Sequence, residues 1–362
     1  MLRYATLRYA TLCYAIILQC ADSRYLCRCP SFLRARTQST LSAQWTHRMP
    51  FLQRTAPTTL ATDLLRDLVG KLEVSSPSTD NSKSSATSSS PYSTSPITIV
   101  DFCSGAGGPT PYIEHELNMR RLAVKKAPIN FLLTDLHPNI DAWMPLAERS
   151  DTLNFLPQSV DAGRPPAAVI SAGSGRGSGN GMVNGYGGTG GVVGKSSGKR
   201  IVRTFYLSFH HFNDEQARRI LKSTLETSDG FAIVELMDRR LFSLLMLMLE
   251  PLLVFLVAPM WFLTDPVYLF FTFVVPALPV IMGWDGIVSL LRTRTFDEVL
   301  ELVDEATGWK GPKSGYGTWL STDGGNRTTV IEREGWVFES GRRLHTWPLG
   351  YCHWVVGRKI NR

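Results

Sequence analysis

Residues 97–111 read ITIVDFCSGAGGPTP, and the interpretation of the rest of the chain depends on this stretch. Ile97 to Val100 favour a β-strand, and Asp101 follows them. The small residues of the turn that comes next are Ser104, Gly105, Ala106, Gly107 and Gly108. Pro109 and Pro111 suit the start of a helix that runs through YIEHELNMRRLAV. Glycines let a ligand touch the backbone and a helix N-terminus offers N–H groups, so the pattern predicts a strand, a ligand-binding turn and a helix.

The spacing of the glycines separates two classes of cofactor. A dinucleotide fingerprint needs a glycine at its sixth position, which here is Thr110, so that match fails. The stretch instead resembles motif I of the class I S-adenosylmethionine (SAM) methyltransferases, in which an acid is followed by glycines at the second, fourth and sixth places. Here Asp101 is followed by Cys103, Gly105 and Gly107, so a cysteine stands in place of the first glycine.

Further elements follow in the order that this family requires. They are a strand at Phe131 to Thr134 before Asp135, the segment LNFLPQSVDA with Asp161 and Ala162, a strand at Arg203 to Phe209 before His210 and His211, a strand ending in Glu235, and two strands within 335–345 and 350–359. The last two predict an antiparallel hairpin, which an ordinary dinucleotide domain lacks. The expected fold is α/β: a Rossmann-like, mostly parallel sheet of seven strands with helices on both faces and an apolar helical hairpin inserted in it.

The resemblance implies SAM as cofactor and a set of residues around it. These residues are Asp101, Cys103, Ser104, Gly105, Ala106, Gly107, Asp135, Leu136, Asp161 and Ala162. Asp135 would bind the ribose hydroxyls, although an ordinary surface turn would also explain it. His210 or His211 is the candidate for a general base, and Glu235 is a further catalytic candidate. The alternative for the two histidines is packing at the rim of the sheet.

Residues 241–291 are almost continuously apolar, and each half is about long enough to cross a bilayer core of ~30 Å. Glu250 and four prolines argue against plain spanning helices. Because both ends must return to the same domain, we expect either a hairpin that turns at Thr264–Asp265 or a re-entrant pair. Arginines at both ends favour a sheet domain on the cytoplasmic side of a membrane. The alternative is a helical cap buried in a soluble core or a dimer interface.

The net charge of +7 over 362 residues is concentrated at the N-terminus, because residues 1–48 hold seven arginines and one aspartate, which gives +6. No basic track remains for nucleic acid, and the cysteine spacing predicts no metal site. Residues 1–48 are typical of a mitochondrial transit peptide, or they precede a true start at Met49. We expect a helix and a Ser-rich linker at 49–95, a methyltransferase-like domain at 96–361, and a disordered Gly-rich loop at 163–200.

The sequence therefore predicts SAM-dependent methyl transfer to a small or lipidic acceptor by an enzyme that contacts the membrane bilayer. Two other functions stay open at this point. One is a membrane scaffold that keeps the fold without activity, because Cys103 replaces a glycine. The other is a nicotinamide-dependent oxidoreductase on a similar sheet, which Thr110 argues against. The composition does not predict the oligomeric state.

Overall fold

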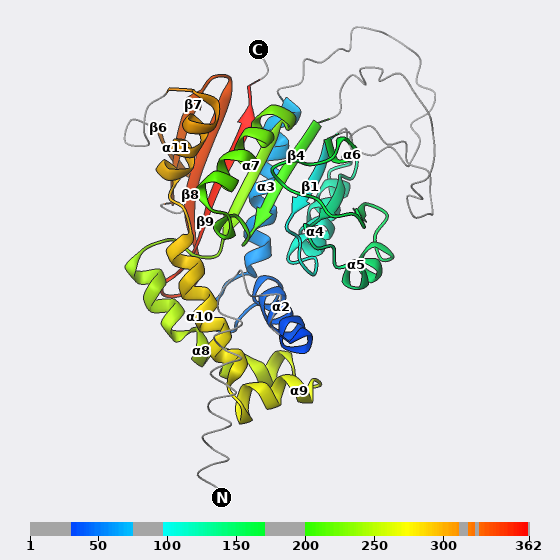
Figure 1. The fold of residues 1–362 in the computed structure, drawn as a ribbon, viewed down its shortest axis with the longest axis vertical. Coiled ribbons are helices and arrows are strands. Elements are labelled where there is room, and N and C mark those ends of the chain that lie inside the picture. Colours follow the sequence, from blue (N-terminus) through cyan, green and yellow to red (C-terminus); the bar gives the residue numbers. More distant parts are fainter. Residues whose placement is uncertain (1–29, 75–96, 171–199, 311–317, 323–325, 361–362) are drawn as a thin grey trace, which may run out of the picture.

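A computed structural model describes residues 30–74, 97–170, 200–310, 318–322 and 326–360, and it contains one mixed sheet in the order β3-β2-β1-β4-β5-β9-β8-β7-β6 (Figure 1). The strands are β1 (Ile97–Phe102), β2 (Asn130–Thr134), β3 (Leu153–Phe155), β4 (Arg200–Tyr206), β5 (Gly230–Glu235), β6 (Thr318–Thr322), β7 (Asn326–Arg333), β8 (Trp336–Thr346) and β9 (Gly350–Lys359). Neighbouring strands from β3 to β5 are parallel, and every pair beyond β5 is antiparallel. The fold is therefore a Rossmann-like α/β sheet with an antiparallel C-terminal part.

Strand β1 lies at the point where the strand order reverses, with β2 on one side and β4 on the other. All six of its residues are buried, as a central strand covered on both faces requires. Open α/β sheets bind ligands outside the carboxyl ends of their strands at such a reversal. The glycine-containing turn after Phe102 is therefore in the position where a ligand is expected.

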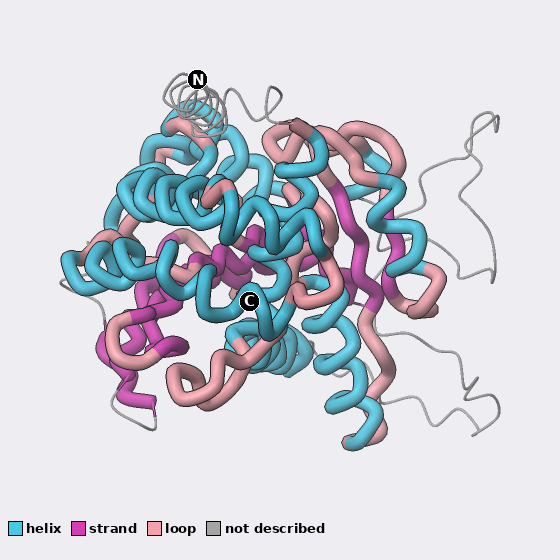
Figure 2. Tube along the Cα trace, turned by 90° about the horizontal axis from the view of Figure 1, so that it is seen from below, coloured by secondary structure: helices cyan, strands magenta, loops and turns pink. Residues whose placement is uncertain are grey.

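Two layers of helices cover the sheet (Figures 1 and 2). The helices that follow or precede its strands are α3 (Pro57–Val74), α4 (Thr110–Ala123), α5 (Ile140–Ala147), α6 (Ala167–Ile170), α7 (Asp214–Thr227) and α11 (Phe296–Thr307). One buried cluster joins α3, α4 and α5 to Ile99 and Val202, and the other joins α7 and α11 to Val100 and Phe205. Each layer therefore buries one of the two alternating faces of β1 and β4.

The structure confirms the C-terminal hairpin and corrects the strand count. Strands β8 and β9 pair antiparallel, and β9 lies against β5 inside the sheet. The expected seven strands become nine, because β6 and β7 extend the edge beyond β8. The strand expected at Arg203 to Phe209 runs from Arg200 to Tyr206 instead, since Leu207 adopts a positive φ of 47° and ends the extended backbone.

The folded domain begins before Pro96, contrary to the boundary that the composition suggested. Helix α3 buries Leu65, Leu68 and Leu72 against the sheet. Helix α2 (Ser31–Thr46), which lies within the expected leader, also packs on the protein, with Leu33 and Trp45 at most 2% exposed. The Ser-rich linker and residues 1–29 lie outside the described residues. Of the loop expected to be disordered at 163–200, residues 171–199 also lie outside them, whereas Ala167–Ile170 form the short helix α6, which corrects that boundary.

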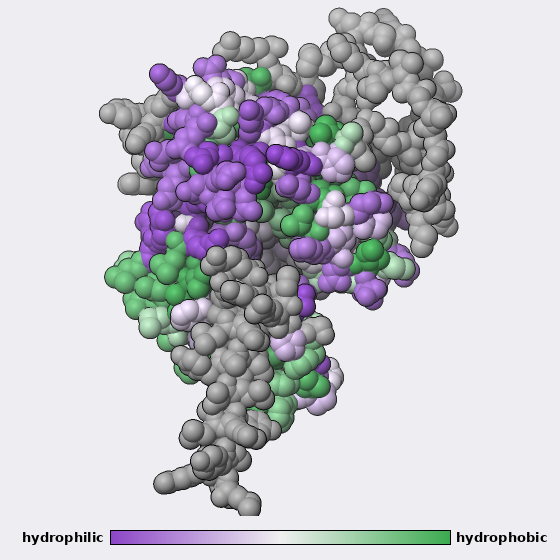
Figure 3. Space-filling view, viewed as in Figure 1, coloured by the Kyte–Doolittle hydropathy of each residue, from purple (hydrophilic) through white to green (hydrophobic). Residues whose placement is uncertain are grey.

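The apolar insert joins β5 to α11 and consists of α8 (Leu241–Trp261), α9 (Pro266–Leu269), the π-helical turn η4 (Phe270–Val274) and α10 (Ala277–Arg292). The chain turns at Thr264–Asp265 as expected, where Asp265 accepts a hydrogen bond from Tyr268 N. The returning half, Pro266–Val274 with Ala277–Arg292, is bent by 77°. Among the described residues, α8 is the one helix that by itself is long and apolar enough to cross a membrane. Hydrophobic surface gathers over the insert, next to a mainly hydrophilic sheet domain (Figure 3).

Candidate functional site

The turn after β1, residues 103–108, is called the glycine loop below. Its backbone adopts positive φ at Cys103 (60°), Gly105 (54°), Gly107 (100°) and Gly108 (49°). The φ of Gly107 favours glycine, and a Cβ there would also lie 2.7 Å from Leu146 Cδ1, so that side chain would have to move. Cys103 holds a left-handed conformation, which glycine adopts without strain. The replacement therefore changes the residue but keeps the path of the loop.

Asp101 lies beneath the glycine loop and organises it. The residue is 2% exposed, and its carboxylate accepts hydrogen bonds from Thr110 Oγ1 at 2.7 Å and Thr204 Oγ1 at 3.3 Å. Burial raises the pKa of Asp101 to about 7, and the hydrogen bond from Thr110 opposes that rise. These contacts tie β1 to β4 and to the first turn of α4. Asp101 therefore supports the loop from inside rather than offering a surface to a ligand.

Asp135 connects the glycine loop to the end of β2. Its Oδ2 accepts a hydrogen bond from Gly105 N at 2.9 Å, and its Oδ1 accepts one from His137 N at 2.8 Å. The side chain is half-buried, and the adjacent Leu136 is 51% exposed. The carboxylate thus lies at the lip of the loop, where each of its oxygens can accept a second hydrogen bond.

The segment that contains Asp161 lies beside this lip. Val160 N donates to Asp135 O at 2.8 Å, and Ser159 Oγ donates to Leu136 O at 2.6 Å. Asp161 is exposed, whereas Ala162 is 5% exposed and belongs to the core. The structure thus brings Asp135, Leu136 and Asp161 together around the glycine loop, while Asp101 and Ala162 lie below the surface.

Cys103 is held among these acids and is not set up as a nucleophile. Burial and the nearby carboxylates Asp135, Asp101 and Asp161 raise the pKa of its thiol. A thiol becomes reactive when its surroundings favour the thiolate, and carboxylates oppose that state. The side chain packs against the core on the α7 face of the sheet.

His210 and Glu235 form a buried pair at the ends of β4 and β5. His210 Nδ1 lies 2.9 Å from Glu235 Oε2, and the residues are 4% and 3% exposed. Burial alone would lower the pKa of His210, but the charge and hydrogen bond of Glu235 raise it overall. Glu235 Oε1 has no hydrogen-bond partner among the described residues. His211 is exposed, and its ring centroid lies 4.2 Å from that of His210.

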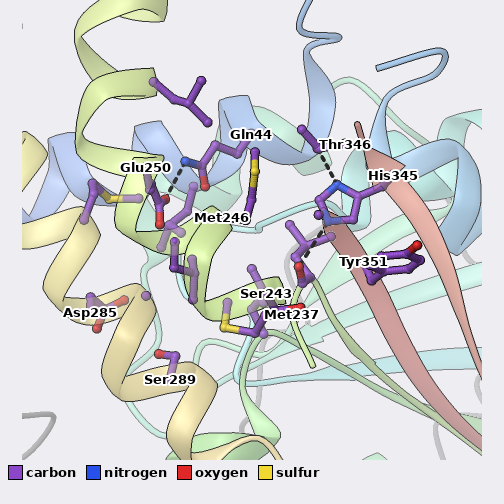
Figure 4. A pocket seen from close by; sticks show the side chains of 18 of the residues that line it. Gln44, Met237, Ser243, Met246, Glu250, Asp285, Ser289, His345, Thr346 and Tyr351 are labelled. Carbon is purple, nitrogen blue, oxygen red and sulfur yellow. Dashed lines mark hydrogen bonds between the residues drawn. The ribbon is translucent and has the colours of Figure 1, made fainter. Parts of the chain in front are cut away.

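A cavity of about 130 Å³ lies between this end of the sheet and the helices α2, α8 and α10 (Figure 4). Its polar lining includes His210, His211, Gln44, Glu250 and Asp285. The apolar lining is supplied by leucines and methionines, namely Leu41, Met49, Leu207, Leu236, Met237, Met246, Leu247, Leu253 and Met282. His345 also lines the cavity, and its Nε2 lies 3.1 Å from Leu236 O. Among the described residues, none that lines this cavity is a lysine or an arginine.

Helix α2 lies close to both the glycine loop and the cavity. A Cβ on Gly105 would lie 3.9 Å from Gln38 Nε2, and Leu41 and Gln44 line the cavity. Side-chain hydrogen bonds from α2 to the insert occur at positions four residues apart: Arg36 with Asp265 (3.1 Å), Thr40 with Tyr268 (2.8 Å) and Gln44 with Glu250 (2.9 Å). The sequence did not predict this role, because residues 1–48, which include α2, were assigned to a leader by their basic composition. The ionisable residues in the insert were the only signal that the insert has a polar side.

No family model matches this chain, and no curated protein matches it either. Human N-acetylserotonin methyltransferase in complex with SAM is similar over 72% of the chain, with a TM-score of 0.32 and 11% identity. The match covers 47% of that protein, so the chain spans about half of its length. A putative Zn-dependent alcohol dehydrogenase from Rhodobacter sphaeroides also matches over 72% of the chain and 84% of its own, with a TM-score of 0.31 and 14% identity. Likenesses this distant do not choose between the two activities.

Proposed function

We propose that this chain transfers a methyl group from SAM to an acceptor held beside His210. The observation that carries the proposal is the position of the C-terminal hairpin, whose strand β9 runs antiparallel beside β5. According to the resemblance, a methyltransferase sheet has such a hairpin and an ordinary dinucleotide-binding sheet lacks it. The glycine loop and Asp135 lie at the strand-order reversal of the same sheet.

The residues around the glycine loop fit the cofactor. Gly105 and Gly107 would lie against its amino-acid portion, Asp135 would accept hydrogen bonds from the ribose, and Leu136 and Asp161 would flank the adenine. When bound, SAM supplies a methyl group made electrophilic by the sulfonium. The half-buried carboxylate of Asp135, fixed by two backbone N–H groups, is preorganised for this task.

His210 is the residue that would remove a proton from the acceptor. Glu235 accepts the Nδ1 proton of His210, which leaves Nε2 as the basic nitrogen. Because His210 lines the cavity, an acceptor bound there can come within reach of the ring. Glu235 acts as a positioning residue, and His211, which is exposed and has no such partner, is the weaker candidate of the two.

The proposal includes contact with one leaflet of a membrane through α8. The outward face of this helix carries exposed apolar side chains at helical spacing, namely Leu241, Leu245, Met248, Leu252, Leu256 and Met260. The opposite side of the insert contacts α2, which holds Arg36 and Gln44 against it. A polar helix along one flank and an apolar face along the other favour an insert that lies against a leaflet rather than one that crosses the bilayer.

Calorimetry with the full chain in detergent tests the proposed cofactor. We expect SAM to bind and Asp135→Ala to weaken that binding by at least about tenfold, because the charged acceptor of the ribose hydroxyls is lost. Asp151→Ala, which removes an exposed acid before β3, should bind SAM like the original protein. Binding of NAD(H) in place of SAM would show an oxidoreductase, and a folded protein that binds neither would show a scaffold.

A further inference from the structure

Helices α8 and α10 each present one face to the cavity. On α8 these positions include Ser243, Met246 and Glu250, and on α10 they include Met282, Asp285 and Ser289. Spacings of three, four and seven residues place such side chains on one side of a helix. The face of α8 that turns away from the cavity is apolar and exposed. Glu250 and Asp285 are therefore directed to the cavity side of these helices (Figure 4).

Glu250 and Asp285, the two carboxylates on this lining, differ in their hydrogen bonding. Glu250 Oε1 accepts a hydrogen bond from Gln44 Nε2 at 2.9 Å. Asp285 is half-buried, and it makes no hydrogen bond or ion pair with the described residues, although its charge acts on His210. A carboxylate without a partner inside a partly apolar cavity is costly, so the site favours a ligand that brings a donor or a positive charge.

The charge of the lining also excludes a class of ligands. Phosphate groups are bound in proteins by arginine, lysine or helix N-termini, and the lining contains neither of these side chains. Its two carboxylates would repel a phosphate. Phospholipids, the most abundant lipids beside an apolar face such as that of α8, are therefore poor candidates for the head group in this cavity.

We propose that the cavity is the acceptor site and that it binds an aliphatic amine, with the ammonium at Asp285 and the chain against the leucines and methionines. This inference rests on the function proposed above and names its substrate class. The ammonium gives one proton to His210, which makes the nitrogen lone pair available. The nitrogen then forms the N–C bond as the S–C bond of SAM breaks and its electron pair remains on sulfur. Methylation therefore occurs on nitrogen.

The test compares three probes with the same chain and different heads: octylamine, octanol and octyl phosphate. Their affinities are measured by calorimetry on the full chain without SAM, so the outcome does not depend on turnover. We expect octylamine to bind most tightly and octyl phosphate not to bind. Equal or tighter binding of octyl phosphate, or equal binding of octanol, would overturn the proposal.

A pair of variants then locates the ammonium. Asp285→Asn should weaken octylamine binding by about tenfold or more, because a charge-assisted contact is lost, and should leave SAM affinity unchanged. Glu301→Gln, which removes an exposed acid on α11, is the matched control. Unchanged octylamine affinity in a folded Asp285→Asn protein would overturn the assignment. Octylamine binding without any SAM binding would overturn the proposed methyl transfer and leave the cavity assignment intact.

Discussion

The glycine loop and the cavity lie at the carboxyl edge of the same sheet but are built in different ways. The loop follows directly from one stretch of chain, and a single distant side chain, Asp135, completes its hydrogen bonding. The cavity is lined by α2, the ends of β4 and β5, α8, α10 and the β8–β9 hairpin. A site made from local backbone can be recognised from a motif, whereas a site made from many elements needs the tertiary structure.

The largest effect is expected from replacing His210, the residue of the His210–Glu235 pair that lines the cavity. Replacing His210 with alanine should lower methyl transfer by roughly 100- to 10,000-fold, because the proposed general base is removed, with SAM affinity unchanged. Turnover is measured with SAM, and the acceptor is whichever of octylamine, octanol and octyl phosphate binds most tightly. His211→Ala is the matched control, and a similar loss in that variant would move the catalytic role to the exposed histidine.

The next largest effect is expected for a chain that starts at Met49, which should impair the cavity more than the glycine loop. It lacks α2, and therefore the buried Leu33 and Trp45, so we expect it to lose more than about 3 kcal/mol of stability. Octylamine binding should fall further than SAM binding, since Gln44 and Leu41 line the cavity and the glycine loop belongs to the sheet. Thermal unfolding and calorimetry measure both effects against a chain that starts at Ser31.

If the chain from Met49 melted at the same temperature as the chain from Ser31, the packing of α2 would not contribute to the fold. The same comparison bears on the expected leader. Because α2 supports the insert, a transit peptide would have to be removed before Ser31 for the packed helix to remain.

Membrane contact is expected to depend on the outer face of α8. Leu252 and Leu256 are 60% and 64% exposed, and changing both to glutamate should lower binding to phosphatidylcholine vesicles by about 100-fold, because apolar contact is replaced by charge. Flotation of the full chain with vesicles measures this. Leu122→Glu, which changes a 53% exposed leucine on α4 of the sheet domain, should float as before. Equal loss in both would point to general destabilisation.

The pH dependence of turnover tests the role of Glu235. His210 must be neutral to accept a proton, so turnover should rise as the pH passes upward through its pKa, which Glu235 raises. Glu235→Gln removes that charge, lowers the pKa of His210, and should move the acid limb of kcat/KM to lower pH. An acid limb that does not move would assign it to another group, such as the amine or Asp285.

The smallest effect is expected at Cys103. Glycine adopts its φ of 60° without strain, so Cys103→Gly should stabilise the protein by about 1 kcal/mol and should not weaken SAM binding. Gly107→Ala is the contrasting change, because its Cβ would meet Leu146. A Cys103→Gly protein with lower stability would mean that thiol packing outweighs the backbone strain.

Much of the sheet could be predicted from sequence, because its strands are apolar runs that end in recognisable turns. The strands before Asp135 and Glu235 and the terminal hairpin all occur where they were expected. Strands β6 and β7 were missed, and α3 was placed outside the domain. Strand β6 lies at the edge of the sheet and β7 beside it, and both are rich in polar residues, so their apolar patterns are weak. The long polar linker after Val74 separated α3 from the sheet that it packs against.

The sequence by itself determined the parallel sheet, the glycine loop, the candidate residues at its strand ends and the position of the apolar insert, since each depends on local propensity and spacing. Only the tertiary structure decided which residues meet. It joined His210 to Glu235, set α2 against the insert, and turned Glu250 and Asp285 toward a cavity. The physical reason is that hydrogen bonding and burial between distant segments depend on how helices and strands pack, and spacing along the chain carries no record of that packing.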